Sequence, residues 1–187
     1  HRHYRRQRQM CIRDRGCPSA GIVFEELAQL GARRFVRVGT CGGLLDGMKM
    51  GDTVVAMSAT ADDTTPIRYS GVNGFSPTAT FALVRAAVDL ASAENSTVHV
   101  GPIVTSGLFY DPDPTAFSKW KSTGHVGVEM EAAMMYTIAA IRRIEALAMM
   151  TVSDVLSDDG STVRISDEEL KHGVDTMMHL ACRIAVS

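Results

Sequence analysis

Apolar residues along the chain recur with two alternating periods, one typical of helices and one typical of strands. Residues 18–31 begin with a proline and end with a glycine, and their apolar positions have helical spacing, which predicts a helix. The segments RRFVRVG (33–39) and DTVVAMSA (52–59) read as strands. Residues 62–78 are rich in Asp, Thr, Pro, Gly and Ser and predict a long loop.

The same alternation continues through the second half of the chain. Further helices are predicted at 79–93, 114–121, 129–143 and 166–186, and further strands at 98–105, 125–128 and 145–153. Strands separated by helices of this length predict a layered α/β fold with a largely parallel sheet. In open α/β sheets, ligands bind beyond the carboxyl ends of the strands. Three predicted strand ends carry unusual chemistry, namely RVGTCGG, GVEMEA and TVSD.

The first of these strand ends places an arginine inside an apolar run. Strand alternation puts Arg37 on one face with Phe35 and Gly39. A charge there must be paired or must serve an anionic ligand. The Thr40 hydroxyl and the N–H groups of the following glycine-rich turn suit a phosphate. Pairing of Arg37 with a core carboxylate is an equally good interpretation of this segment, whose spacing is not the GxGxxG of dinucleotide sites.

The second strand end carries two glutamates two positions apart. Glu129 and Glu131 are expected to point in different directions, which argues against one acid/base pair. The helix dipole favours a carboxylate at this position for structural reasons alone. The functional alternative is that one carboxylate accepts hydrogen bonds from a vicinal diol such as that of ribose. Met130 then packs on the sugar, unless it is an ordinary core residue.

The third strand end places Ser153 and Asp154 after a nearly continuous apolar strand. Desolvation at the end of a buried strand raises the pKa of an aspartate, which suits a proton donor. A turn or helix-capping aspartate is the structural alternative.

The amino-acid composition excludes several classes of protein. The 187 residues are 45% hydrophobic and 21% charged, which excludes global disorder. No apolar run is long enough to span a membrane, and a net charge of −2 argues against a dedicated nucleic-acid binder. Four cysteines in a chain of this length do not form a disulfide scaffold. We therefore expect a soluble, cytoplasmic protein.

The charge is concentrated at the start of the chain. Residues 1–15 hold six arginines and one aspartate, whereas the remainder has 13 basic and 20 acidic residues. A nucleic-acid-binding arm and a transit peptide are possible functional interpretations. The string RRQRQMCIRDR is more typical of translated adaptor sequence, so we interpret residues 1–15 as a non-native leader and residues 16–187 as the domain. Cys11 and Cys17 lack metal-site spacing.

RVGTCGG, SGLFYDPD, GVEMEAA and TVSD, in this order and spacing, resemble the signature stretches of the nucleoside phosphorylase family, of the hexameric purine nucleoside and uridine phosphorylase type. The resemblance covers residues 16–187. It implies a three-layer α/β/α fold with a central mixed, largely parallel β-sheet. It also implies that the family's N-terminal strand and Gly-Asp-Pro phosphate loop are missing from this chain, which is then truncated.

The resemblance also implies roles for individual residues. The implied phosphate-binding residues are Arg37, Val38, Gly39 and Thr40. The implied nucleoside-binding residues are Cys41, Gly42, Phe109, Val128, Glu129, Met130, Glu131, Ser153 and Asp154. Asp154 is the implied catalytic proton donor to purine N7. The chain lacks the family's acid-assisting arginine at its usual spacing, with Arg164 as the nearest candidate.

The implied reaction is reversible phosphorolysis of purine nucleosides to free base and (deoxy)ribose 1-phosphate. Phosphate is then a co-substrate, and neither a metal nor an organic cofactor is expected. A homo-oligomer, hexamer or dimer, is implied, with no nucleic-acid or membrane partner. The alternatives are a uridine or methylthioadenosine phosphorylase, a hydrolytic nucleosidase, and an inactive fragment that only binds or assembles.

Overall fold

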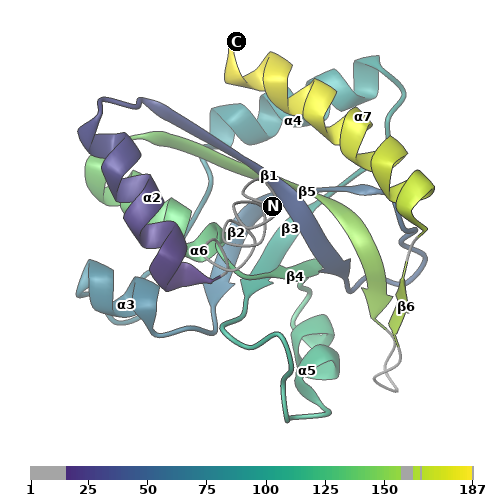
Figure 1. The fold of residues 1–187 in the computed structure, drawn as a ribbon, viewed down its shortest axis with the longest axis horizontal. Coiled ribbons are helices and arrows are strands. Elements are labelled where there is room, and N and C mark those ends of the chain that lie inside the picture. The colour runs from purple at the N-terminus through teal and green to yellow at the C-terminus, as the bar shows by residue number, and fades with distance from the viewer. Residues whose placement is uncertain (1–15, 157–161, 165, 187) are drawn as a thin grey trace, which may run out of the picture.

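The computed structural model describes residues 16–156, 162–164 and 166–186, which form a mixed α/β structure (Figure 1). The predicted leader, residues 1–15, and residues 157–161, 165 and 187 lie outside the described residues. The strands are β1 (Arg34–Gly43), β2 (Thr53–Ala61), β3 (Val98–Thr105), β4 (Gly127–Glu129), β5 (Glu145–Leu156) and β6 (Thr162–Arg164). The helices are α2 (Cys17–Gln29), α3 (Thr65–Ser70), α4 (Phe81–Ala93), α5 (Ala116–Ser122), α6 (Ala132–Arg142) and α7 (Asp167–Ala185).

The sheet is mixed, and five of its strands close into a ring. The strand order is β1-β4-β3-β2-β5-β6, with an additional pairing of β1 and β5. β1 runs parallel to β5, and β3 runs parallel to both β2 and β4. β4 pairs antiparallel with β1, and β5 pairs antiparallel with β2 and β6. The predicted α/β class is therefore confirmed, whereas closure of the sheet was not predicted.

Helices cover the sheet on two sides (Figure 1). α2, α3 and α6 pack together on one side, and α4 and α7 on the other. The alternation of β5 explains this arrangement. Ala148, Met150 and Val152 belong to the apolar cluster that includes α6, whereas Leu147 and Met149 belong to the cluster of α4 and α7. β5 is buried on both faces, as its nearly continuous apolar sequence predicted.

α6 is held in the core by a buried hydroxyl. Tyr136 donates a hydrogen bond to the carbonyl of Ala56 at 2.7 Å and accepts one from the N–H of Ala148 at 2.8 Å. Ala56 and Ala148 are the pair at which the antiparallel ladder between β2 and β5 stops. The hydroxyl thus satisfies both backbone groups where the two strands separate.

Most of the predicted elements are present, with informative differences at three places. Residues 65–70 form the helix α3 inside the stretch predicted as a loop. The helix predicted to begin at Glu129 begins at Ala132, because Glu129 ends β4 and its side chain hydrogen-bonds to the first N–H groups of the helix. β6 was not predicted. Within the described part of the chain, none of the helices combines the length and the apolar character needed to cross a membrane.

Candidate functional site

The three strand ends marked by the sequence lie side by side. Gly42 in β1 pairs with Val128 of β4 on one side and with Asp154 of β5 on the other. The register between β1 and β5 shifts between Cys41 and Gly42 and leaves Ser153 unpaired in the ladder. Such bulges re-aim side chains and are common beside active sites. The three strand ends with unusual chemistry are therefore neighbours in the sheet.

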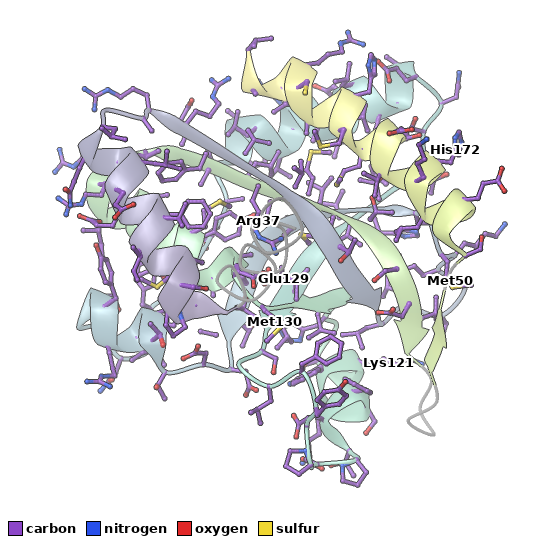
Figure 2. All side chains as sticks on the ribbon, in the orientation of Figure 1. Arg37, Met50, Lys121, Glu129, Met130 and His172 are labelled. Atoms are coloured by element: carbon purple, nitrogen blue, oxygen red, sulfur yellow. The ribbon has the colours of Figure 1, made fainter. Side chains whose placement is uncertain are left out.

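Arg37, in the middle of β1, contacts the carboxylates of Glu129 and Glu131, and Figure 2 shows it near Glu129. Its Nη2 donates to Glu131 Oε2 at 2.5 Å and lies 3.1 Å from Glu129 Oε2. Burial lowers the pKa of Arg37, but the two carboxylates outweigh burial and the net shift is upward. The guanidinium is therefore permanently charged. Nη1 is also buried, and it has no hydrogen-bond partner among the residues that the structure describes.

Glu129 is buried and surrounded by donors. Its carboxylate accepts hydrogen bonds from the Thr105 hydroxyl at 2.5 Å and from the backbone N–H groups of Glu131 and Ala132 at 2.8 and 3.0 Å. Burial raises the pKa of Glu129, and the net shift stays upward although Arg37 and the Thr105 hydroxyl lower it. Every donor around the carboxylate favours its charged form. Glu129 is therefore the fixed counter-ion of Arg37.

Glu131 completes the cluster from the start of α6. Its Oε2 contacts Arg37, and its Oε1 accepts a hydrogen bond from the N–H of Gly16 at 2.6 Å, just before α2. The expectation that Glu129 and Glu131 point in different directions was wrong, because both reach the same nitrogen of Arg37. The reason is that Glu129 still belongs to β4, and the chain turns before the helix begins.

Gly39 makes room for the arginine. A Cβ atom placed on Gly39 would lie 3.1 Å from Arg37 Nη1 and 3.3 Å from Nη2. The guanidinium therefore packs over the glycine on the face of β1 predicted from strand alternation. Thr40 is exposed and, by the same alternation, lies on the opposite face. The structure brings Arg37 together with the two glutamates, but not with the Thr40 side chain.

Comparison with known proteins places this arrangement in a family. A model of the phosphorylase superfamily matches residues 7–185, nearly the whole chain. The chain belongs to the phosphorylase superfamily. Its relatives include a DeoD-type purine nucleoside phosphorylase of Clostridium beijerinckii, 44% identical over 74% of the chain and 59% of the relative. The DeoD-type enzyme of Alkaliphilus metalliredigens is 36% identical over 91% of the chain and 72% of the relative. The DeoD-type 2 purine nucleoside phosphorylase of Vibrio cholerae is 37% identical over 92% of the chain and 72% of the relative.

In this superfamily member, the third strand end is tied to the first through Ser153. Its Oγ lies 3.3 Å from the carbonyl oxygen of Cys41 and 3.2 Å from Asp154 Oδ2, and its single proton serves one of them at a time. Asp154 is partly exposed. The bulge thus brings the carboxylate of Asp154 to the rim of the strand-end region.

The thiol of Cys41 is free and buried. Burial is the main cause that raises the pKa of the Cys41 thiol, and Glu129 raises it further. The thiol therefore stays protonated and packs as a small apolar group. A Cβ on Gly127 would lie 3.5 Å from its sulfur, so β4 approaches β1 closely there. Within the described ranges, no group of three or more His, Cys, Asp or Glu residues is placed to bind a metal.

The remaining predicted residues differ in exposure. Val128 and Met130 are half-buried, and Val38 is exposed. Phe109 lies on the loop after β3, is 68% exposed and packs edge-on against Tyr110 at 5.0 Å.

Sequence reasoning missed Thr105 and Gly16, which hold the two carboxylates. Thr105 ends β3, as the marked residues end β1, β4 and β5. Its place at the end of a strand was the signal that could have identified it. Threonine is common in strands, however, so a single threonine after a run of apolar residues does not stand out.

Proposed function

We propose that the chain carries the active site of a purine nucleoside phosphorylase, which splits purine (deoxy)ribonucleosides with phosphate into free base and (deoxy)ribose 1-phosphate. The observation that carries the proposal is the buried Arg37. Its Nη1 has no hydrogen-bond partner among the described residues, and its Nη2 contacts Glu131, a carboxylate able to bind ribose. The similarity to DeoD-type purine nucleoside phosphorylases supports the choice of substrate. The three-layer α/β/α description is proposed for the two helical groups and the sheet between them.

Phosphate binds at the Arg37 guanidinium in this proposal. Gly39 lies against the guanidinium, whereas the side chains of Val38 and Thr40 lie on the opposite face of β1, so in this proposal those two residues contribute backbone groups to the phosphate site. Guanidinium groups bind phosphate oxygens through charge-assisted hydrogen bonds. Arg37 is also pre-oriented by its two carboxylates, so little side-chain entropy is lost when phosphate binds.

The nucleoside occupies the adjoining strand ends. Glu131 accepts hydrogen bonds from the ribose hydroxyls, Met130 packs on the sugar, and Glu129 keeps Arg37 in place. The base lies among Cys41, Gly42, Phe109 and Val128, with Ser153 and Asp154 facing it.

The chemistry follows from charge on the two sides of the sugar. As the bond between C1′ and the base lengthens, positive charge builds on the sugar, and a phosphate dianion held by Arg37 stabilises it. The phosphate oxygen then forms a bond to C1′. The bonding electrons leave with the purine, and Asp154 donates a proton to N7. Phosphate is the co-substrate, and the steps require no other cofactor.

The setting of the enzyme is part of the proposal. We place it in the cytoplasm, since Cys17, Cys41 and Cys182 are free thiols, as expected in a reducing compartment. We propose residues 16–187 as the phosphorylase domain. A homo-oligomer, hexamer or dimer, is supported by exposed apolar side chains such as Ile22 on α2 and Leu30 just after it. Neither nucleic acid nor a membrane is a partner.

A panel of nucleosides tests the substrate. Inosine, adenosine, uridine and methylthioadenosine are incubated with the protein and phosphate, and the released bases are separated by chromatography. We expect inosine or adenosine to be cleaved fastest. Preference for uridine or methylthioadenosine would contradict the purine assignment, and the absence of any cleavage would identify a chain that only binds or assembles.

A further inference from the structure

Thr105 connects the end of β3 to the charged cluster through a buried hydroxyl. The residue is 0% exposed, and its Oγ1 accepts a hydrogen bond from the N–H of Ala133 at 3.0 Å. An N–H can only donate, so the hydroxyl proton is free to be donated to Glu129 Oε1, 2.5 Å away. Thr105 and Glu129 are also direct neighbours in the parallel pairing of β3 and β4. The backbone register thus holds the two side chains together.

Thr105 and Glu129 jointly complete the start of α6. The first N–H groups of a helix have no partner within it and need one from elsewhere. Glu129 accepts from the N–H groups of Glu131 and Ala132, and Thr105 accepts from that of Ala133. With these bonds in place, the Glu129 carboxylate has a single orientation, which presents Oε2 to Arg37 Nη2 at 3.1 Å.

We propose that Thr105 is a positioning residue of the site, which fixes the Glu129 carboxylate so that Arg37 keeps Nη1 open for a phosphate oxygen. The inference rests on the proposed phosphate-dependent reaction, because the open nitrogen is the one assigned to phosphate. Thr105 itself touches no substrate. Its effect passes through Glu129 to the guanidinium.

Loss of the Thr105 hydroxyl is expected to change how Glu129 contacts Arg37. Without the Thr105 donor, Glu129 Oε1 is less well satisfied and turns toward the other strong donor nearby, the Arg37 guanidinium. Both guanidinium nitrogens are then engaged by carboxylates, and phosphate must displace one of them. Phosphate affinity falls, while residues that contact the base keep their places.

A series of substitutions at Thr105 separates positioning from simple helix capping. Thr105→Val removes the hydroxyl at nearly constant shape, Thr105→Ser retains it, and Thr105→Cys keeps a weak donor and protects the test if the valine variant does not fold. Thr137→Val is the matched control, since Thr137 is 0% exposed and its hydroxyl donates to the α6 carbonyl of Ala133 at 2.7 Å, away from Glu129.

Calorimetric titration with inorganic phosphate is the first measurement. We expect the dissociation constant to rise about tenfold in Thr105→Val, the size expected for a lost hydrogen bond to a charged group. Thr105→Cys should fall between, and Thr105→Ser and Thr137→Val should match the unchanged protein. If Thr105→Val, or Thr105→Cys where valine does not fold, melts at a lower temperature yet binds phosphate normally, Thr105 only caps α6 and the proposal is overturned.

A second measurement does not depend on phosphate. The pKa of Glu129 is followed by carboxyl-carbon NMR, and we expect it to be higher in Thr105→Val than in the unchanged protein and in Thr137→Val. An unchanged Glu129 titration would contradict the positioning role. Failure of the unchanged protein to bind phosphate, with the Glu129 shift present, would instead overturn the proposed function and the phosphate part of this inference, leaving the link between Thr105 and Glu129.

Discussion

Arg37 donates a hydrogen bond to Glu131 at 2.5 Å, so the residue proposed to bind phosphate neutralises the residue proposed to bind ribose. The cluster of Arg37, Glu129 and Glu131 carries one positive and two potential negative charges. A phosphate dianion therefore enters against net negative charge, except at the guanidinium itself. In the proposed site, we expect phosphate at Nη1 to draw on the same guanidinium charge that holds Glu131 at Nη2, so that the Glu131 carboxylate accepts hydrogen bonds from the ribose hydroxyls more readily. In the proposed site, one ion pair therefore links the two substrates.

Replacement of Arg37 by lysine tests the anion-binding role. We expect Arg37→Lys to raise the KM for phosphate tenfold or more, roughly the loss of one charge-assisted hydrogen bond, because an ammonium cannot span two carboxylates and a phosphate. The measurement is the initial rate of phosphorolysis over a range of phosphate concentrations. Arg68→Lys, at an exposed position on α3, is the control. Equal phosphate KM values for both variants would remove Arg37 from the phosphate site.

Replacement of Asp154 by asparagine tests its proposed role as the proton donor. We expect Asp154→Asn to lower turnover of inosine by about 10²- to 10⁴-fold, as the loss of a general acid does. Turnover of 7-methylinosine should fall far less, since its base already carries the positive charge that protonation would supply. Asp89→Asn, exposed on α4, controls for loss of surface charge. Equal losses for inosine and 7-methylinosine would show that Asp154 does not act as the acid.

The contact between Gly39 and Arg37 makes a steric prediction. In Gly39→Ala the new methyl lies 3.1 Å from Arg37 Nη1, and the guanidinium has to shift by a few tenths of an ångström. Because Nη1 is the nitrogen assigned to phosphate, we expect weaker phosphate binding by titration, with the protein still folded by circular dichroism. Unchanged phosphate affinity would mean that the arginine position is not critical.

Glu25 gives the chain a defined pH dependence of stability. Hydrogen bonds from Tyr69 and then Arg142 lower the pKa of Glu25 below its ordinary value of 4.5. A lowered pKa stabilises the folded state above the unfolded value, and this stabilisation is lost as the pH falls through the folded value. We expect Glu25→Gln to lower the free energy of unfolding at pH 7 by at most about 1 kcal/mol, since the groups are solvent-screened. Urea denaturation should show the difference shrinking as the pH falls below 4.5. A difference that does not change with pH would contradict this.

Local patterns predicted the elements but not how the sheet closes. The continuous apolar run of β5 predicted a strand buried on both faces, and an arginine in an apolar strand predicted a paired or ligand-binding charge. Both interpretations of Arg37, pairing with a carboxylate and binding of an anion, remain relevant. Its Nη2 is paired with two carboxylates, and its Nη1 has no hydrogen-bond partner among the described residues. Ring closure depends on pairing of β1 with both β4 and β5, which local periodicity does not encode. α3 was missed because its sequence, TPIRYS, has the composition of a loop.

The positions of the carboxylates were beyond sequence reasoning for a related reason. Whether Glu129 and Glu131 converge depends on where β4 ends and α6 begins, and a shift of three residues reverses the answer. The side chain of Glu129 sets that boundary by accepting the N–H groups of the helix. Helix starts of this kind depend on a partner strand, here β3 with Thr105, and no residue pattern within α6 signals it.

The phosphate dependence of inosine cleavage tests the central claim most directly. The protein is incubated with inosine in a buffer free of phosphate and in one that contains it, and hypoxanthine and the sugar product are followed by chromatography and phosphorus NMR. We predict that hypoxanthine and ribose 1-phosphate form together and only when phosphate is present. Equal release of hypoxanthine without phosphate, with free ribose as the sugar product, would contradict the account and identify a hydrolytic nucleosidase.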